Sequence, residues 1–220
     1  MRNVVVTGGS RGLGLGIAEA LVSAGYRVIA VARNPGAGLV AAIEALEPAS
    51  RDNLRFRPFD LSEIAAIPDF VRGLRKEVGP IYGLVNNAGI GSSGVLATMN
   101  DAQIEEVVRL NTISPIVLTK YIVRSMMADG EGRIVNISSV VSFTGFNGLA
   151  VYSATKASMV GFTRSLAREV GSLGITVNAV APGFVDTEMT GSVGGQDPNQ
   201  RSRRVAPNSA FSAAYSREGS

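Results

Sequence analysis

The sequence predicts an α/β fold, a doubly wound parallel sheet of about six strands with helices on both faces. Short runs of β-branched apolar residues alternate with longer segments of helical pattern along the chain. This alternation is typical of parallel strands joined by helical crossovers. The strand-like runs are also continuously apolar, as expected for parallel strands that are buried on both faces. A length of 220 residues suits one such domain.

Each predicted strand is an apolar run that stops at polar or glycine residues. The strands are expected at Val4–Thr7, Arg27–Val31, Leu54–Phe59, Gly83–Asn86, Arg133–Ser138 and Ile175–Val180. Ligands of doubly wound sheets bind beyond the carboxyl ends of the strands. Because polar or glycine residues stand at all six ends, we expect the ligand site at this edge of the sheet.

The helices between these strands have recognisable starts and stops. Gly25 occupies a left-handed cap position after the first helix, and Asn100 opens a capping box that ends at Gln103. Pro115 should bend the long helix that follows or end its first half. The helices are expected at Gly14–Ala24, Leu39–Leu46, Ile64–Val78, from Asn100 onward, and Ala150–Val170.

The composition excludes several classes of chemistry. The chain has no cysteine and no histidine, which removes disulfides, thiolate metal sites, Ser-His-Asp hydrolysis and most zinc chemistry, so no metal site is expected. No apolar run approaches the roughly 18 residues of a membrane span, and the start has no signal peptide. We therefore expect a cytoplasmic protein with no membrane partner, whose acid/base chemistry falls to Tyr, Lys, Asp or Glu.

The charge gives little reason to expect a nucleic-acid partner. The net charge is +3, and residues 191–220 contribute four arginines against two acids. The high pI is thus largely a property of this last segment. A weaker alternative makes the segment a binding arm for nucleic acid or acidic surfaces.

Tyr152 and Lys156 are the strongest candidates for acid/base catalysis. Residues four apart share one face of a helix. A free phenol has a pKa near about 10, and a nearby lysine cation favours the phenolate and lowers that pKa. The pair can therefore act as a tuned general acid/base. Such spacing is usually only a solvated helix face, but here Ser139 lies upstream and a glycine-rich turn opens the chain.

That turn, Gly8–Gly14, follows the first strand and opens the first helix. Glycine lets the backbone approach a pyrophosphate, whose charge the helix N-terminus attracts. The alternative is an ordinary glycine-rich βα turn. The spacing G-x-x-x-G-x-G also differs from the commoner dinucleotide pattern G-x-G-x-x-G.

The motifs taken together resemble the short-chain dehydrogenase/reductase family over residues 1–190. The resemblance implies a Rossmann-type dinucleotide-binding domain. Two segments, 7–12 and 181–190, are most similar to bacterial 3-oxoacyl-(acyl-carrier-protein) reductases, which act in fatty acid biosynthesis. The motifs are T-G-x-x-x-G-x-G at Thr7–Gly14, N-N-A-G at Asn86–Gly89, Asn111, Ser139, Y-x-x-x-K at Tyr152–Lys156, and Pro182-Gly183.

The resemblance implies four catalytic roles. Tyr152 would protonate a carbonyl oxygen during reduction, and Lys156 would lower the pKa of Tyr152 and bind the nicotinamide ribose. Ser139 would hydrogen-bond the substrate oxygen; Ser138 could take this role, but only Ser139 has the family spacing to Tyr152. Asn111 would hold a water that links Lys156 to solvent. The alternatives are turn chemistry for Ser139 and helix packing for Asn111.

The second strand favours NADP(H) over NAD(H). NAD enzymes usually place an acid at the end of this strand to bind the ribose 2′-hydroxyl, whereas here Arg33 follows Ala32. Arg33 and Arg11 could clamp a 2′-phosphate; alternatively, Arg33 is a solvated loop residue. The full set of expected cofactor contacts is Thr7, Gly8, Ser10, Arg11, Gly12, Leu13, Gly14, Arg33, Asp60, Leu61, Asn87, Ala88, Gly89, Tyr152, Lys156, Pro182, Gly183, Val185 and Thr187.

The expected substrate is a small carbonyl compound or an acyl thioester. Asp129 and Glu131 would repel an acidic carrier protein, and Leu173 stands where a basic residue would help. A free ketone or a coenzyme A thioester is therefore an alternative to a carrier-bound substrate. The family commonly forms oligomers through its fourth and fifth helices, and both are present.

The chain departs from the family pattern after Thr190, as a truncated or frameshifted sequence would. Residues 191–220 are polar and glycine-rich, which predicts a disordered tail. The last family strand would then be missing, the sixth strand would form an exposed edge, and the substrate pocket would lose a wall. An alternative function follows: a catalytically impaired NADP-binding remnant that acts only as a subunit or binding protein.

Overall fold

The computed structural model describes residues 1–183 and 211–213. The strands form one sheet in the order β3-β2-β1-β4-β5-β6-β7. The first six strands run parallel, as each of their five pairings shows. Chain order reverses between β1 and β4, which makes the sheet doubly wound. The predicted fold class is confirmed.

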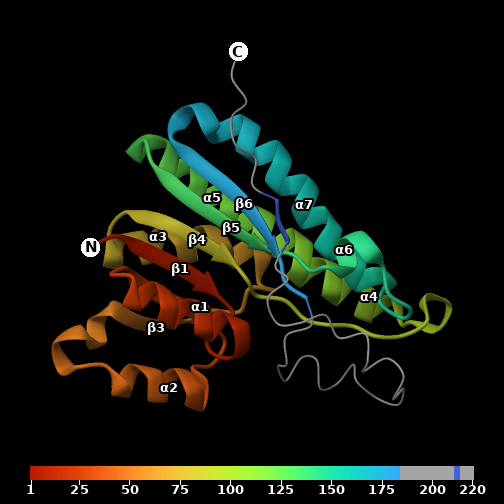
Figure 1. The fold of residues 1–220 in the computed structure, drawn as a ribbon, viewed down its shortest axis with the longest axis horizontal. Helices are drawn as coiled ribbons and strands as arrows, with labels where there is room; N and C mark the ends of the chain where they lie inside the picture. Colours follow the sequence, from red (N-terminus) through yellow and green to blue (C-terminus); the bar gives the residue numbers. More distant parts are fainter. Residues whose placement is uncertain (184–210, 214–220) are drawn as a thin grey trace.

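The elements alternate along the chain as the sequence predicts (Figure 1). The strands are β1 (Asn3–Thr7), β2 (Arg27–Ala32), β3 (Leu54–Pro58), β4 (Ile81–Asn86), β5 (Gly132–Ile137), β6 (Ile175–Ala181) and β7 (Phe211–Ala213). The α-helices are α1 (Gly12–Ser23), α2 (Gly36–Ala45), α3 (Ile67–Val78), α4 (Asp101–Val108), α5 (Ser114–Asp129), α6 (Val141–Thr144) and α7 (Ala150–Val170). Short 3-10 helices at Pro48–Asn53, Ile64–Ala66, Leu96–Thr98 and Gly171–Leu173 and a π-helical turn at Arg109–Ile113 complete the set.

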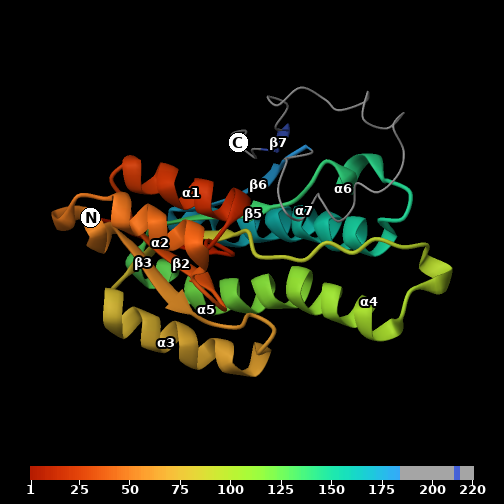
Figure 2. The same ribbon diagram turned by 90° about the horizontal axis from the view of Figure 1, so that it is seen from below.

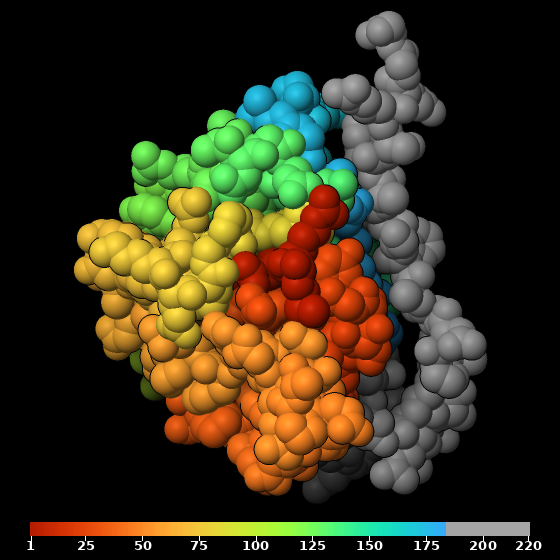
Figure 3. All heavy atoms as spheres, turned by 90° about the vertical axis from the view of Figure 1, so that its left-hand side faces the viewer, coloured from red at the N-terminus to blue at the C-terminus, as the bar shows by residue number. Residues whose placement is uncertain are grey.

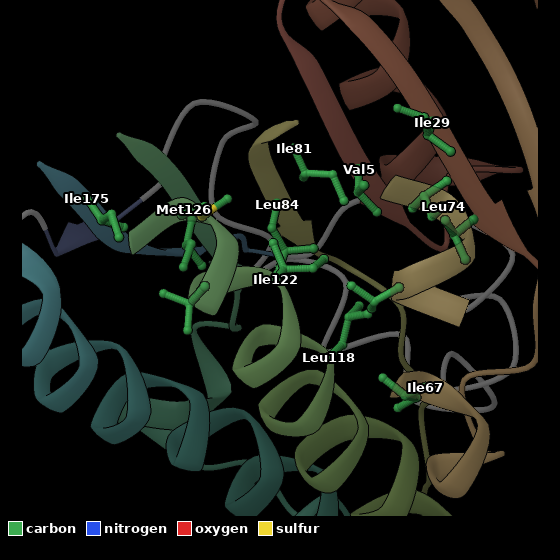
Figure 4. Close-up of a cluster of buried hydrophobic side chains, with 14 of the residues drawn as sticks. Val5, Ile29, Ile67, Leu74, Ile81, Leu84, Leu118, Ile122, Met126 and Ile175 are labelled. Atoms are coloured by element: carbon green, nitrogen blue, oxygen red, sulfur yellow. The ribbon is translucent and has the colours of Figure 1, made fainter. Parts of the chain in front are cut away.

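Two apolar layers hold the helices against the sheet. On one face α3, α5 and α7 pack on the central strands (Figure 2), and Figure 4 shows Leu118 and Ile122 of α5 against Leu84. On the other face α1 and α2 bury residues such as Leu39 and Ala18 against the strands. Val5, Ile29 and their neighbours are fully buried because parallel strands lie between two helical layers.

Element boundaries differ from the predictions mainly at the helix ends. The first helix begins at Gly12 rather than Gly14, and the second covers Gly36–Ala45. The predicted cap at Asn100 is present, since its side-chain oxygen accepts from Ala102 N at 2.9 Å. The first half of the long helix, α4, ends at Val108 before a π-helical turn, and Pro115 lies in the first turn of α5, in agreement with the predicted interruption near Pro115. The short helix α6 has too few residues to show a period and was not predicted.

The first residue of β1, Asn3, is hydrogen-bonded to the C-terminal end of α3. Asn3 Nδ2 donates to the carbonyl oxygens of Val78 and Pro80 at 2.7 and 2.9 Å. In the space-filling view the amino-terminal residues, in red, border the yellow segment that includes α3 and β4 (Figure 3). Across the described residues, no helix is long and apolar enough to cross a membrane.

The sixth strand is not wholly exposed at its edge, which corrects one expectation. Phe211–Ala213 form β7, which pairs antiparallel with Ala179–Ala181 of β6. The sheet therefore has a seventh strand, contributed by the polar last segment. Unpaired backbone groups at a sheet edge can recruit any extended segment, whatever its side chains. The rest of the predicted tail, residues 191–210 and 214–220, lies outside the described residues.

The turn between β1 and α1 is packed so closely that it needs glycine. Gly8 has φ +65°, in the left-handed region that side chains disfavour. A methyl group at Gly14 would overlap the carbonyl oxygen of Gly8 and the side-chain amide of Asn87. Gly16, one half-turn along the same helix, is exposed and has nothing within 4 Å of its would-be Cβ.

We expect Gly14→Ala and Gly16→Ala to change stability in opposite directions. Overlap with backbone at position 14 should lower the free energy of unfolding by about 1–3 kcal/mol. At position 16 the added methyl should raise it by roughly 0.5–1 kcal/mol, because alanine loses less entropy in a helix. Urea denaturation of both variants beside the parent protein measures the difference. Equal effects of the two substitutions would contradict the packing of this turn.

Candidate active site

The carboxyl ends of β1, β4, β5 and β6 meet at one edge of the sheet (Figure 1). Asn87 follows β4, Ser139 follows β5 and Pro182 follows β6, while Tyr152 and Lys156 lie in the first two turns of α7. Sequence spacing predicted this edge, and the parallel register brings these side chains together there.

The Ser139 hydroxyl lies close enough to the Tyr152 phenol at the centre of this edge to influence its pKa. Burial raises the pKa of the Tyr152 phenol, and the Ser139 hydroxyl opposes that rise only in part. The pKa of Tyr152 is therefore above its ordinary value, with desolvation of the phenolate as the main cause. Tyr152 is protonated at neutral pH and can donate a proton, and a lowering of its pKa by Lys156 stays a prediction.

Lys156 is deeply buried for a charged residue. Only 6% of its surface is exposed, and its Nζ donates to the carbonyl oxygen of Ile137 at 2.9 Å. The ammonium lies 5.8 Å from the centre of the Tyr152 ring. Burial lowers the pKa of Lys156 to about 8. Lys156 can therefore exchange a proton near neutral pH, unlike a surface lysine.

Asn111 is buried, and its side-chain amide joins three segments of the site. Its Oδ1 accepts from Ile90 N at 2.9 Å, and its Nδ2 donates to Ile90 O at 2.9 Å. The same Nδ2 approaches Thr155 Oγ1 on α7 at 3.2 Å. The amide thus fixes the loop after β4 against α7, and its hydrogen-bonding groups are already occupied.

The backbone carbonyl oxygen of Asn111 is affected by Pro115, four residues later. In a regular α-helix the carbonyl oxygen of residue 111 accepts from the N–H of residue 115. Proline has no N–H, and here the helix widens to a π-turn in which Ser114 N donates to Arg109 O. The carbonyl oxygen of Asn111 thus lacks the donor that a regular α-helix would provide, whereas its side-chain amide is bonded. Isolated π-turns often occur at functional sites.

Ser138 and Thr155 support the site, although the sequence analysis gave neither a supporting role. Ser138 Oγ is buried and donates to the carbonyl oxygen of Lys156 at 2.8 Å. It is therefore occupied, whereas Ser139 is partly exposed and faces Tyr152. Thr155 Oγ1 donates to Tyr152 O at 2.8 Å. Their only signal in the sequence is proximity to Ser139 and Tyr152.

A buried polar ladder anchors the helices behind these residues. Asn86 Nδ2 donates to Thr119 Oγ1 on α5 at 2.9 Å and to Asn136 Oδ1 on β5 at 2.8 Å. Asn136 Nδ2 in turn donates to Thr163 Oγ1 on α7 at 2.8 Å. The helices α5 and α7 are thus both bonded to the sheet next to the candidate site. The pattern was missed because buried asparagines in apolar strands have no local signature.

The glycine turn and the segment after β4 form a cradle of backbone groups. Thr7 Oγ1 accepts from the N–H groups of Asn87 and Ala88 at 2.9 and 3.0 Å. Asn87 Nδ2 donates back to Thr7 O at 2.9 Å. Gly89 lies beside the catalytic groups, since a Cβ there would be 3.0 Å from Asn111 Oδ1.

The cradle meets the requirements of a dinucleotide phosphate. No side chain caps the N-terminus of α1, whose residue Arg11 is extended at φ −161°. The first N–H groups of a helix need a partner, and an anion can supply it. The space beside Gly14 is filled by the Gly8 backbone and the Asn87 amide, so only glycine fits this turn. The residues Gly8–Gly14 therefore fit the pyrophosphate of a nicotinamide cofactor.

The residues after β2 and β3 lie together at the adjoining edge. Arg33 is exposed and close enough to Asp60 to contribute to the lowered pKa of that carboxyl. The larger cause is hydrogen bonding from Ser62, whose N–H and hydroxyl donate to Asp60 Oδ1 at 2.9 and 2.7 Å. The Leu61 side chain belongs to the apolar core, so only its backbone can border a ligand.

The end of β6 completes the described part of the site. Pro182 O accepts from Val140 N at 3.0 Å, which holds the strand end beside the segment that carries Ser139. Gly183 follows it and is the last described residue before the gap. The predicted cofactor contacts Val185 and Thr187 lie outside the described residues.

Comparisons with known proteins agree with this arrangement. A family model described as short chain dehydrogenase matches residues 2–198. The chain is 40% identical over 186 residues to the 3-oxoacyl-(acyl-carrier-protein) reductase FabG of Escherichia coli strain K12, which covers 84% of this chain and 74% of that protein. The namesake protein of Vibrio cholerae is 39% identical with the same coverage.

Solved structures show the same likeness. A metagenomic short-chain oxidoreductase in complex with NADP has a TM-score of 0.77 and 35% identity, covering 84% of this chain and 83% of that one. A short-chain dehydrogenase from Streptomyces avermitilis has a TM-score of 0.77 and 33% identity, covering 86% of this chain and 69% of that one.

We expect Lys156→Met to raise the free energy of unfolding at neutral pH, because burial of the charged Lys156 ammonium destabilises the folded state. The folded pKa, about 8, lies below the ordinary lysine value of 10.5. Between these values the unfolded chain binds a proton that the folded chain does not, so stability should rise with pH through this window. Below pH 8 both states are charged and the full cost, about 3 kcal/mol, is present.

The variant should therefore unfold at higher urea concentration than the parent at pH 7, and the gain should shrink toward pH 10. Urea midpoints at pH 7, 8.5 and 10 measure it, and Arg164→Met on the exposed face of α7 controls for loss of a cation. A constant difference across pH would show that Lys156 is not desolvated as the structure indicates.

Proposed function

The chain belongs to the short-chain dehydrogenase family, and from this membership we propose that it reduces a ketone to a secondary alcohol with NADPH. The observation that carries the proposal is that Tyr152, Ser139 and the buried Lys156 lie together next to the uncapped N-terminus of α1. A proton donor, an oxygen-binding hydroxyl and a phosphate cradle then share one edge of the sheet.

The chain's own residues supply the proton and orient the carbonyl. Ser139 would donate to the substrate oxygen, and Tyr152 would transfer its phenolic proton to that oxygen as negative charge develops there. The bound nicotinamide would supply the hydride that adds to the carbonyl carbon. Product release would leave Tyr152 as a phenolate that must be reprotonated.

Reprotonation would pass through Lys156 and Asn111. Lys156 has a pKa of about 8 and lies near Tyr152, so it can give up a proton at modest cost. A water on the backbone carbonyl oxygen of Asn111 would connect Lys156 to solvent. Pro115 supports this role, because it lacks the N–H that would bond this oxygen in a regular α-helix.

The cofactor preference rests on charge and on relatives. Arg33 is exposed at the end of β2, where a ribose-binding acid is absent. A solved relative at 35% identity is in complex with NADP. The guanidinium of Arg33 would pair with the 2′-phosphate, assisted by Arg11 from the glycine turn.

A 3-oxoacyl thioester is the substrate class we favour. The relatives at 39–40% identity are 3-oxoacyl-(acyl-carrier-protein) reductases. Val95, Leu96 and Phe143, which follow β4 and β5, are 62%, 55% and 55% exposed, and such apolar surface would suit an acyl chain. Glu131 is paired with Arg2 at 2.7 Å, which weakens the repulsion expected toward an acidic carrier.

Oligomerisation through α5 and α7 forms part of the proposal. Ile113, Ile116 and Met127 are 41%, 36% and 45% exposed along the long helix. A stripe of apolar residues on a helix surface is consistent with burial against a second copy. Size-exclusion chromatography with light scattering would test this.

The competing function is NADPH binding without turnover. It is distinguished by running an NADPH fluorescence titration beside an acetoacetyl-coenzyme A reduction assay. Binding together with turnover supports the enzyme, whereas saturable binding without turnover of any 3-oxoacyl thioester supports the binding subunit.

We expect Tyr152→Phe to lower kcat by about 10²- to 10⁴-fold, the usual contribution of a positioned general acid. NADPH affinity should stay nearly unchanged, because the turn Gly8–Gly14 supplies most of the contacts. Phenylalanine keeps the ring packing, so circular dichroism should match the parent. Retention of most of the turnover would remove Tyr152 from the mechanism.

We expect Arg33→Asp to narrow or invert the preference for NADPH over NADH. A carboxylate repels a 2′-phosphate and accepts hydrogen bonds from a 2′-hydroxyl; loss of the charge-assisted bond alone corresponds to roughly 10- to 100-fold. The ratio of kcat/KM for the two cofactors measures it, with Arg33→Gln as the neutral control. Equal kcat/KM values for NADPH and NADH in the unmodified protein would show that Arg33 does not select NADPH.

A further inference from the structure

A groove of about 300 Å³ runs between α3 and α5. Both helices contribute residues at spacing i, i+3, i+4 and i+7, so each presents one face to it. Val71, Tyr121 and Ala128 form apolar walls, and Arg72, Arg75 and Arg124 bring three guanidinium groups to it. None of these residues belongs to the site at the carboxyl edge.

The arginines of this groove differ from others on the surface. Arg2, Arg55 and Arg57 each pair with a carboxylate, at 2.7, 2.6 and 3.0 Å. Within residues 1–183, by contrast, no carboxylate forms an ion pair with Arg75 or Arg124. Arg75 on α3 and Arg124 on α5 therefore border the groove, and no carboxylate of the described residues pairs with either of them.

The remaining charge indicates what the groove would bind. Arg72 pairs with Asp69 one helical turn earlier, at 2.5 Å. Three guanidinium groups and one carboxylate leave a charge of about two positive units, which matches the −1.5 to −2 of a phosphate monoester at pH 7. Arginine also presents paired N–H donors that fit the oxygens of such a group.

We propose that the α3–α5 groove is a second binding site, for a small organic phosphate monoester. The phosphate would lie between Arg75 and Arg124, and an apolar or aromatic portion would lie on Val71, Tyr121 and Ala128. The volume is at the lower limit of small-molecule sites, about 300–1,000 Å³, so a compact metabolite fits and a dinucleotide does not. The proposal is independent of the reaction at Tyr152.

Calorimetric titration of the full chain with phenyl phosphate at low salt tests the site. The double variant Arg75→Gln/Arg124→Gln should weaken binding by about tenfold or more, since charge-assisted hydrogen bonds are lost. Asp69→Asn should strengthen binding several-fold, because it frees Arg72 from its competing carboxylate. A purely structural role of these residues would not produce that gain.

Matched controls separate this groove from other cationic surface. Arg164→Gln removes an exposed arginine from α7 and should leave the affinity unchanged. Arg33→Gln should also leave it unchanged, whereas loss of binding there would assign phenyl phosphate to the cofactor site. Phenol should not bind, and benzoate should bind more weakly. Affinity that is the same in the double variant and the parent, or no binding by the parent at millimolar ligand, would overturn the proposal.

Discussion

The site depends on one buried amide, that of Asn111. Its three hydrogen bonds hold the loop after β4, the long helix α4–α5 and the helix α7 in one arrangement. An unsatisfied amide at this depth would cost about 1–3 kcal/mol, so the three segments are stable only when they meet correctly. Gly89 lies beside both Asn111 and Lys156. Thr155, which accepts from Asn111, donates to the carbonyl oxygen of Tyr152. The geometry of the reacting groups is therefore a consequence of satisfying Asn111.

Burial has opposite effects on the two titrating groups of the pair. It raises the pKa of the Tyr152 phenol and lowers that of the Lys156 ammonium, because each loses hydration of its charged form. Their pKa values therefore move apart, since the ordinary values are 10.0 and 10.5 and the buried phenol rises while the buried ammonium falls to about 8. A phenolate at Tyr152 would accordingly take a proton from Lys156, directly or through a shared water, with a favourable change in free energy. Desolvation, rather than a direct ion pair, brings this about.

The sheet shows how a strand edge can be completed by an unrelated segment. β6 ends just before Pro182 at the site, and three of its residues pair with β7 from the last part of the chain. This segment has no strand-like pattern, yet backbone hydrogen bonding needs no particular side chains. The parallel core from β3 to β6 is specified much more strongly, since its apolar residues fill both layers of the core.

The sequence determined the order of elements, the parallel sheet, the edge that carries the site and the residues Tyr152, Lys156, Ser139 and the glycine turn. These follow from local periodicity, from turn chemistry and from a family pattern of fixed spacing. Helix ends and the π-turn were predicted less well, because they depend on which terminal groups find partners in other segments.

The family spacing already favoured Ser139 over Ser138, but only the tertiary structure shows a physical reason, the hydrogen bond from Ser138 Oγ to Lys156 O that occupies the first hydroxyl. It also placed the pKa of Tyr152 above its ordinary value through burial, and it divided the roles of the Asn111 amide and carbonyl. In each case the outcome depends on burial and on partners from distant parts of the chain, as in the bonds from Asn111 to Ile90 and Thr155, 21 and 44 residues away. The spacing of residues along one helix or strand does not indicate such contacts. It does not indicate desolvation either, because the atoms that surround a group are known only after the chain has folded.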